Sequence, residues 1–578
     1  MSQIAPRAPA APTPASTRPV QPSAATRPAP EKPATPQPQP PPQAEPEKPE
    51  FVVESAKRLS DSLIWRMQRE GYTRRAQTAW APDAVPFYIT SNAYIAAAYA
   101  RVVQGYLRDC VSAQAPPLGP FDREAPVYVL ELAAGSGQFA YLFLKKLLPA
   151  LREVPALAGV RFRYVMSDLV AGNVEAWRTR ERLRPFVEEG VLDFARFDIE
   201  QDREVKLLAS GETLSPKTLK NPLAVIGNYT FDTTAQDAFW MKDGKLHEGL
   251  VSLVSNRKEE PPVDPTVVSR ATLRFEQRPV STDYYEDKAL NAVLAHYAER
   301  LGNTSLLFPI GALKGIRSLM ALSRDRLLVL SGDKGYTHED ELVARGDPQL
   351  AVHGGDCFSM MVNYHAIGLY FRERGGQPLH AATRDKRLKV SAFLQGGPGA
   401  AWPETASAFR QATEGFSPCD YFTLATEVRK QLPAATLEVI LALLRLGEWD
   451  AHLLYNFSSA IAEQAKSAPD HLRQELVRAL ERCWEHWYPM SQDVPFEIGR
   501  IYGALERPVD ALRFYDESLR LYKEHPATLF NAGLCRYRLQ QPKEALALME
   551  RALRLKPDYA PAREWRLRIQ GELAQAGR

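Results

Sequence analysis

Tyr128-Val-Leu-Glu131-Leu-Ala-Ala-Gly135-Ser136-Gly137-Gln138-Phe139 is the stretch that decides the fold of this chain. The apolar run before the acidic residue predicts a short buried strand, and the two glycines predict a tight turn. The apolar pattern at 139–148 predicts a helix directly after that turn. Glycines let the backbone approach a ligand closely, and a helix N-terminus offers free N–H groups to a carboxylate or phosphate. We therefore expect a strand–turn–helix unit that holds a ligand at its turn.

The surrounding sequence repeats this alternation of short strands and helices. Helical periodicity covers 58–71 and 92–107, and Asp243-Gly244 predicts a hairpin turn. Strands separated by helices imply βαβ units and a parallel sheet, so the chain is expected to hold an α/β Rossmann-like domain. Further short apolar runs predict strands at 161–166, 192–197, 223–226 and 327–330.

Polar side chains stand at the ends of four successive predicted strands: Glu131, Asp168, Asp198 and Asn228. Ligands of open α/β sheets bind at the carboxyl ends of the strands, so these side chains are expected to share one site. Glu131 would order the turn and meet an ammonium group, Asp168 would hold ribose hydroxyls, and Asp198 would accept from an adenine amino group. Taken singly, each acid could instead cap a loop or a helix.

The glycine turn resembles the first motif of class I S-adenosylmethionine-dependent methyltransferases more closely than a dinucleotide fingerprint, whose third small residue would be Ala140. Later segments follow in an order that resembles the MidA-like family, which includes mitochondrial complex I assembly methyltransferases. The resemblance covers roughly residues 60–385. Besides the turn, it rests on 88–94 (Tyr-Ile-Thr-Ser-Asn-Ala-Tyr), 228–233 (Asn-Tyr-Thr-Phe-Asp-Thr), 328–336 (Leu-Val-Leu-Ser-Gly-Asp-Lys-Gly-Tyr) and 355–364 (Gly-Asp-Cys-Phe-Ser-Met-Met-Val-Asn-Tyr).

This resemblance implies an enzyme that uses S-adenosyl-L-methionine and methylates a protein, with arginine as one candidate acceptor. It implies that Asn228 and Asp232 border the reacting centre. The family pattern changes at several positions, where this chain has Phe87, Tyr229, Lys334 and an Asp232-Thr233-Thr234-Ala235 segment without proline. The changes at Phe87 and Tyr229 remove carboxylates that would orient a guanidinium, so the acceptor stays open. The cofactor-binding residues that the resemblance implies are Glu131, Gly135, Gly137, Asp168 and Asp198.

Three aromatic residues near the start of the predicted domain, Tyr88, Tyr94 and Tyr99, could roof the ligand cleft. Core packing is the more common use of such side chains, and we favour it.

Composition restricts the other classes of function. The 578 residues are 45% hydrophobic with a net charge of +3, which does not indicate a nucleic-acid-binding protein. The chain has no apolar run long enough for a membrane helix and no apolar signal core, and its five scattered cysteines fit a reduced compartment, so we expect a cytoplasmic protein. No metal site is expected, since a CxxC pair is absent, His353-Gly-Gly-Asp356-Cys357 suits a loop turn, and His365 suits a packed or interfacial position.

The two ends of the chain differ from its centre. Residues 1–50 hold 16 of the 46 prolines and predict a disordered tail, which serves as a tether or as a ligand of a proline-binding module. The methyltransferase domain with an N-terminal helical cover is expected at 51–420, and helical tetratricopeptide-like repeats at 425–578. Four positions recur 34 residues apart, a period typical of tetratricopeptide repeats. They pair Gly499 with Gly533, Ala511 with Ala545, Tyr515 with Met549 and Ser518 with Ala552.

Residues 560–575 predict a capping helix, and 434–487 predict degenerate helix pairs. Such arrays bind peptides, pack on their own catalytic domain or dimerise, and the oligomeric state stays open. Our leading hypothesis is a methyltransferase whose protein or peptide substrate is recruited by the repeats. The alternatives are a non-catalytic scaffold or assembly factor, favoured by the altered Asn228–Ala235 segment, and a methyltransferase of small molecules.

Overall fold

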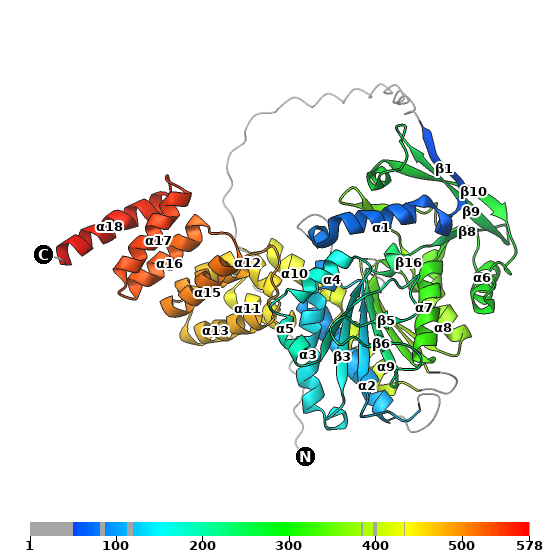
Figure 1. Cartoon of the computed structure of the whole chain (residues 1–578), viewed down its shortest axis with the longest axis horizontal. Helices are drawn as coiled ribbons and strands as arrows, with labels where there is room; N and C mark the ends of the chain where they lie inside the picture. The colour runs from blue at the N-terminus through cyan, green and yellow to red at the C-terminus, as the bar shows by residue number, and fades with distance from the viewer. Residues whose placement is uncertain are drawn as a thin grey trace, which may run out of the picture. The chain divides into compact units, whose positions relative to one another are not determined.

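The computed structural model of the chain describes residues 50–80, 87–112, 119–382, 385, 387–396, 401–432 and 434–576 (Figure 1). The predicted disordered tail lies, except for Glu50, outside the described residues. Among the described helices, none combines the length and apolar character that crossing a membrane requires.

A seven-stranded sheet forms the centre of the structure. Five consecutive strands, from β12 to the edge strand β4, are parallel, and one antiparallel strand, β18, lies between β12 and the other edge strand, β17. This doubly wound order with an inserted antiparallel strand is the class I methyltransferase fold, which confirms the predicted α/β Rossmann-like class. From edge to edge the strands are β17 (Gln377–His380), β18 (Lys389–Gln395), β12 (Leu327–Asp333), β7 (Leu223–Asn228), β2 (Val127–Leu132), β3 (Phe162–Asp168) and β4 (Leu192–Arg196).

Helices cover both faces of this sheet, as Figure 1 shows for α3 and α7. Alternate residues of each strand point to opposite faces, so Val127 and Val129 join one core while Tyr128 and Leu130 join the other. The first core packs against α2 (Ala93–Ser112), α3 (Gln138–Glu153), α4 (Ala171–Arg178), α5 (Arg184–Glu188) and α9 (Pro403–Arg410). The second packs against α6 (Lys288–Arg300), α7 (Ile310–Ser323) and α8 (Tyr364–Glu373).

A second, antiparallel sheet lies beside the first and was not predicted as a sheet. Its strands are β1 (Phe51–Arg58), β9 (Lys245–Ser255), β8 (Asp237–Lys242), β11 (Thr304–Phe308) and β10 (Ala271–Pro279). The predicted Asp243-Gly244 hairpin joins β8 to β9. The helix predicted from 58 begins only at Leu63, because 51–58 pairs with β9; Ser62 then caps α1 (Leu63–Arg75) through Ile64 N. Short strand pairs are β5 (Val205–Lys206) with β6 (Thr213–Leu214), β13 (Gly335–Tyr336) with β16 (Val362–Asn363), and β14 (Ala351–His353) with β15 (Cys357–Ser359).

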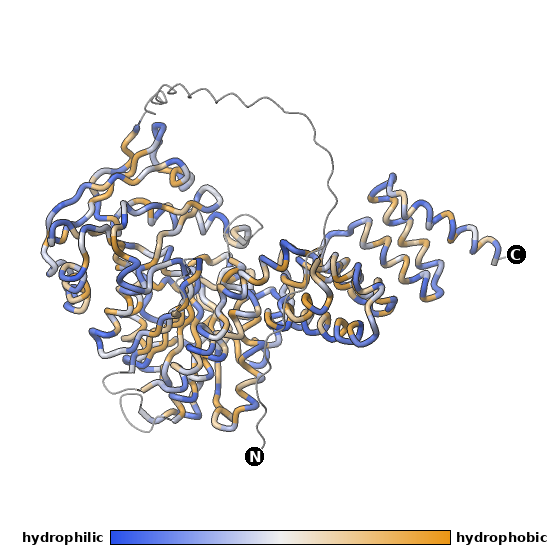
Figure 2. Tube along the Cα trace, turned by 180° about the vertical axis from the view of Figure 1, so that it is seen from behind, coloured by the Kyte–Doolittle hydropathy of each residue, from blue (hydrophilic) through white to orange (hydrophobic). Residues whose placement is uncertain are grey.

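The C-terminal part is helical, and we call α10–α18 the helical array. A Cβ placed on Gly499 would lie 2.7 Å from the Tyr515 ring, and one on Gly533 would lie 2.8 Å from Met549 Cε. The 34-residue sequence repeat therefore corresponds to one repeated close helix packing. Figure 2 shows hydrophobic and hydrophilic residues alternating along these helices. The helices are α10 (Pro418–Lys430), α11 (Leu437–Leu446), α12 (Ala451–Ala465), α13 (Asp470–Glu485), α14 (Val494–Ala504), α15 (Pro508–Leu521), α16 (Pro526–Arg538), α17 (Pro542–Leu555) and α18 (Ala560–Ala576).

Candidate functional site

A cavity opens at the carboxyl ends of β2, β3, β4 and β7, and we call it the edge cavity. Five of the seven residues predicted from sequence line it: Glu131, Gly135, Asp168, Asp198 and Asn228. The other two, Gly137 and Asp232, are absent from its described lining but adjoin residues that belong to it. The sheet edge thus brings the predicted residues together, while the roles assigned to them stay predictions.

Asp168 holds the glycine turn in place. Its Oδ2 accepts from Gly135 N and from Asn173 Nδ2, both at 3.1 Å, and its Oδ1 accepts from Val170 N at 2.8 Å. Burial raises the pKa of Asp168, and these hydrogen bonds act against that rise. The carboxylate of Asp168, at the end of β3, thus orders the glycine turn that follows the neighbouring strand β2. The sequence had predicted only a contact with ribose hydroxyls for this residue.

Gly137 stands where a side chain would not fit. Its φ is +81°, in the left-handed region that favours glycine. A Cβ here would lie 2.8 Å from Met166 Cε and 3.0 Å from Tyr488 Oη. The residue is needed for the shape of the turn rather than for direct contact with the cavity.

Glu131 is a buried carboxyl group at the floor of the edge cavity. Its exposure is 5%, and its Oε2 has no hydrogen-bond partner among the described residues. Burial raises the pKa of Glu131 to about 8, since the charged form is poorly solvated there, and the nearby hydroxyl of Tyr164 acts against this rise. A buried oxygen without a partner is costly, so a cationic ligand group in the cavity would stabilise the ionised form.

Helix α1 supplies a wall of the edge cavity through Gln68, Arg69 and Tyr72. Arg69 forms ion pairs with Asp198 and Glu200, so the acid predicted to meet adenine also holds a guanidinium. The side-chain amide of Gln68 donates from Nε2 to the carbonyl of Phe358 and accepts at Oε1 from the N–H of Phe358. These two hydrogen bonds connect α1 to β15. The periodicity of 58–71 predicted a helix here, but no motif in the sequence distinguishes these three residues.

Asn228 ends β7 at the cavity, and Tyr229 follows the strand and also lines the cavity. The hydroxyl of Tyr99 donates to Asn228 Oδ1 at 2.9 Å, which orients the amide. Tyr229 has a φ of +48°, an unusual backbone conformation for a bulky residue and one often found at functional sites. Of the aromatic residues considered as a roof, none lines the edge cavity: Tyr88 donates to Asp450 at 2.7 Å and Tyr94 stacks on Tyr421. Core packing, the favoured interpretation, holds for the buried Tyr94 and Tyr99, whereas Tyr88 is half-buried.

Two buried carboxyl groups, Asp232 and Asp333, lie together behind the cavity wall. The N–H of Asp232 donates to Asp333 Oδ2 at 3.1 Å, and Asp232 Oδ1 has no hydrogen-bond partner among the described residues. Burial raises the pKa of both groups, and the charge of Asp232 raises that of Asp333 further. Such a pair retains a proton near neutral pH because two adjacent buried carboxylates repel each other. Asp333 was quoted in the sequence motif but not predicted as a site residue.

The helical array contacts the back of the glycine turn. Tyr488 is 4% exposed and packs in the same core as α2 and α3. The hydroxyl of Tyr141 on α3 donates to Glu485 O at 2.8 Å, and Lys146 pairs with Glu448 at 3.0 Å. The array is therefore packed against the α/β domain of its own chain, and packing on the same chain is one of the three uses of such arrays considered from sequence.

Comparisons with known proteins give one family match. Residues 526–559, which span α16 and α17, match the tetratricopeptide repeat model. The curated proteins contain no match to this chain.

Solved structures similar to this chain include two proteins from Burkholderia thailandensis. One is a superfamily member inferred to be a methyl transferase and bound to S-adenosyl-homocysteine; identity is 14%, the TM-score is 0.37, and the match covers 60% of this chain and 90% of that chain. The other is an uncharacterized protein of the same superfamily, at 14% identity and a TM-score of 0.32, covering 59% of this chain and 95% of that chain.

Proposed function

We propose that this chain is a cytoplasmic S-adenosylmethionine-dependent methyltransferase that acts on a protein or peptide. The observation that carries the proposal is the Glu131 carboxyl group, buried and with an unpartnered oxygen, beside the glycine turn that Asp168 orders. A ligand with a cationic group at this point would complete the site. The solved relative with S-adenosyl-homocysteine agrees with this choice of ligand.

The residues of the edge cavity suit the parts of S-adenosyl-L-methionine. Glu131 would pair with the ammonium group, Asp168 would face the ribose hydroxyls, and Asp198 would accept from the adenine amino group. Gly135 and Gly137 would keep the turn close to the ligand. When bound, this cofactor supplies a methyl group on a positively charged sulfur, and the acidic lining favours that charge.

The chain's remaining task is to position the acceptor and to take its proton. Methyl transfer depends mainly on placing the nucleophile in line, which Asn228 and the rings of Tyr72 and Tyr229 would do at the cavity wall. The Asp232–Asp333 pair would accept the proton of the acceptor, because a raised pKa makes its ionised member a competent base near neutral pH. Arginine is one acceptor compatible with two nearby carboxyl groups.

The substrate would be recruited by the helical array. A groove among α12, α14, α15 and α16 carries Lys466, Arg500 and Arg538 against one acidic residue, Glu463. Lys466 pairs with Glu463 and Arg500 pairs with Glu497, which leaves Arg538 as the most available cation of the groove. Residues 536–578 add ten basic against five acidic residues. An acidic protein segment would complement this groove. The proposed function involves neither a nucleic acid nor a membrane as a partner.

The first experiment is a calorimetric titration of the full chain with S-adenosylmethionine and S-adenosylhomocysteine. Micromolar binding is expected for the wild type, and Glu131→Gln should weaken it at least tenfold because the carboxylate is lost. Glu506→Gln, on the exposed turn after α14, is the matched control and should bind as the wild type does. A folded wild type that binds neither compound would contradict the proposal.

Recruitment is tested separately by methyl transfer to a protein substrate. Arg538→Glu should reduce transfer several-fold and leave cofactor affinity unchanged, since Arg538 lines the array groove and not the edge cavity. Equal transfer by this variant would contradict recruitment through the groove.

The second candidate function is a non-catalytic scaffold. Two observations favour it. Arg69 forms an ion pair with Asp198, the residue proposed to contact adenine, and the family pattern is lost after Asn228. Absent cofactor binding in the same titration would favour the scaffold and shift interest to partners of the helical array.

A further inference from the structure

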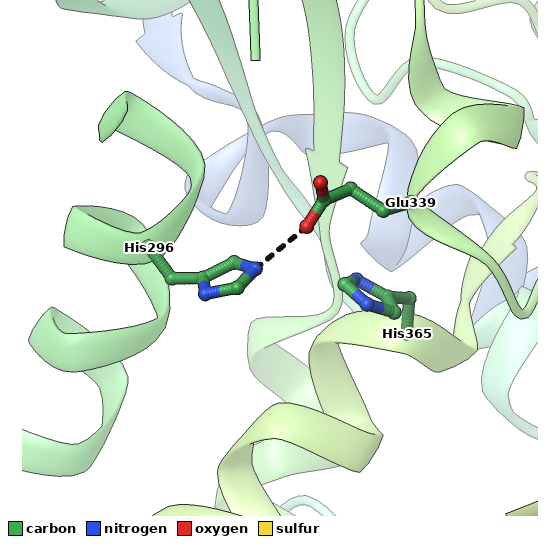
Figure 3. A group of neighbouring side chains, drawn as sticks. All are labelled: His296, Glu339 and His365. Carbon is green, nitrogen blue, oxygen red and sulfur yellow. Dashed lines mark hydrogen bonds and ion pairs between the residues drawn. The ribbon is translucent and has the colours of Figure 1, made fainter. Parts of the chain in front are cut away.

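Three side chains that are distant in sequence meet outside the edge cavity. His296 on α6, Glu339 on the short helix Glu339–Leu342 and His365 on α8 place one potential ligand atom each within 4.8 Å of one another (Figure 3). Figure 3 shows both imidazole rings turned toward the carboxylate. The sequence predicted a packed or interfacial role for His365 and no metal site.

We propose that His296, Glu339 and His365 bind a divalent transition metal ion, for which Zn²⁺ is the best chemical match. Two imidazoles and one carboxylate are a common three-residue donor set for zinc, with water as a fourth ligand. Hard ions such as Mg²⁺ and Ca²⁺ prefer sites built of oxygen ligands alone. A tetrahedral site with metal–nitrogen distances of about 2.0 Å places its ligand atoms roughly 3.3 Å apart. The distances between the ligand atoms of the cluster bracket this value: His296 Nε2 lies 2.8 Å from Glu339 Oε2, and all three ligand atoms lie within 4.8 Å of one another.

A hydrogen-bond chain behind His365 orients it as a ligand. Its Nδ1 lies 2.9 Å from the hydroxyl of Tyr297, which itself can donate to Asn363 Oδ1 at 3.4 Å. With the phenol proton directed at Asn363, the phenol oxygen accepts from a protonated Nδ1. Nε2 of His365 then carries the lone pair that a metal requires, as in sites where an outer partner sets the tautomer.

The carboxylate of Glu339 also has an outer partner. Arg300 Nε lies 2.9 Å from both of its oxygens, and the Arg300 side chain is 58% exposed. Arg300 can therefore retain one oxygen while the other binds the ion, which keeps the carboxylate in place. On metal binding, the Nε2 proton of His296 would move to Nδ1 or leave to solvent, so the bond to Glu339 is replaced by two bonds to the ion.

An ion can reach the cluster through a second cavity. Glu339 and His365 line it together with His338, Asp340 and His380. This cavity shares no lining residue with the edge cavity. The ion would join α6, α8 and the segment that follows Asp333, three parts of the chain that are not adjacent in sequence. Its expected effect is on stability, and cofactor affinity should not depend on it.

The test uses the full chain, treated with a chelator, dialysed and titrated with ZnCl₂ by calorimetry. We expect binding of one ion per chain, weakened at least tenfold in Glu339→Gln and in His365→Gln. His247→Gln, a histidine on β9 outside the cluster, is the matched control and should bind as the wild type does. Unaltered circular dichroism and S-adenosylhomocysteine affinity would show that the variants are folded. A wild type that binds no ion, or ligand variants that bind it equally well, would overturn the proposal.

A second measurement does not depend on any variant. X-ray absorption of the zinc-loaded wild type should show nitrogen and oxygen ligands with the scattering of two imidazoles. Sulfur ligands, or the absence of imidazole scattering, would place the ion elsewhere and refute the site.

Discussion

The hydroxyl of Tyr488, in the helical array, donates a hydrogen bond of 3.2 Å to the main-chain carbonyl of Ser136, in the glycine turn. These residues are 352 positions apart in the chain. The array thus supports the turn directly, so removing the whole array would also remove a support of the proposed cofactor site. Single substitutions within the array therefore distinguish its proposed recruitment of the substrate from its support of the glycine turn. Deletion of 425–578 would remove both at once.

Replacing Tyr488 should weaken cofactor binding although the residue does not line the edge cavity. Tyr488→Phe loses one hydrogen bond, worth about 1 kcal/mol, and should reduce affinity about threefold to fivefold. Tyr488→Ala also leaves a buried space beside Gly137 and should have a larger effect. Calorimetric affinities of both variants for S-adenosylhomocysteine test this, with Tyr559→Phe as a control. Unchanged affinity in Tyr488→Ala would show that the contact does not support the turn.

Gly137→Ala should damage the turn in two ways. The φ of +81° is strained for alanine, and the added Cβ would meet Met166 and Tyr488. We expect a loss of about 1–3 kcal/mol in the free energy of unfolding and a marked loss of cofactor affinity. Gly190→Ala separates the two causes, since it also has a positive φ of 71° but an open surrounding, and should leave cofactor affinity unchanged. Denaturant unfolding and calorimetry measure the two effects.

Glu131 should make the ligand-free protein less stable as pH rises. Its pKa is about 8 in the folded state against 4.5 for a solvent-exposed glutamic acid, so the unfolded chain releases this proton at lower pH. The protein therefore loses stability from about pH 4.5 to pH 8, by an amount on the order of a few kcal/mol. Glu131→Gln abolishes this contribution. The melting temperature of the variant minus that of the wild type should therefore increase as pH increases from 5 to 9. A constant difference between the two melting temperatures over this range would contradict the assigned pKa.

Asp333→Asn should slow methyl transfer without weakening cofactor binding. One member of the Asp232–Asp333 pair ionises as pH rises and becomes the base, while the other member keeps its proton, so wild-type activity should increase through the neutral range. Loss of a general base lowers kcat by about 10²–10⁴-fold, and the variant should lose the pH dependence of that step. Asp325→Asn, an exposed acid before β12, is the control. A variant with wild-type kcat and pH profile would exclude the pair from proton transfer.

Much of the central fold could be predicted because its signals are local. The apolar run before Gly135 and the helix after Gly137 occupy the predicted positions, since alternation and glycine turns act over a few residues. The four strand-end residues were found because parallel strands align their carboxyl ends at one edge. The array repeat was visible for the same reason: one packing unit recurs at a constant spacing.

Other features required the tertiary structure because they join distant segments. β1 was not predicted, and only its last residue, Arg58, was assigned to a helix, because the pairing of β1 with β9 joins residues roughly two hundred positions apart. Arg69 at Asp198, Asp333 at Asp232 and Tyr488 at Ser136 carry no motif, because each contact arises only when separate elements pack. The sequence alone determined the class of fold and the sheet edge at which the edge cavity lies, through local pattern and strand direction. The tertiary structure decided which side chains line the cavity at that edge, which charged groups pair there and which residues pack behind the glycine turn. It also brought together His296, Glu339 and His365.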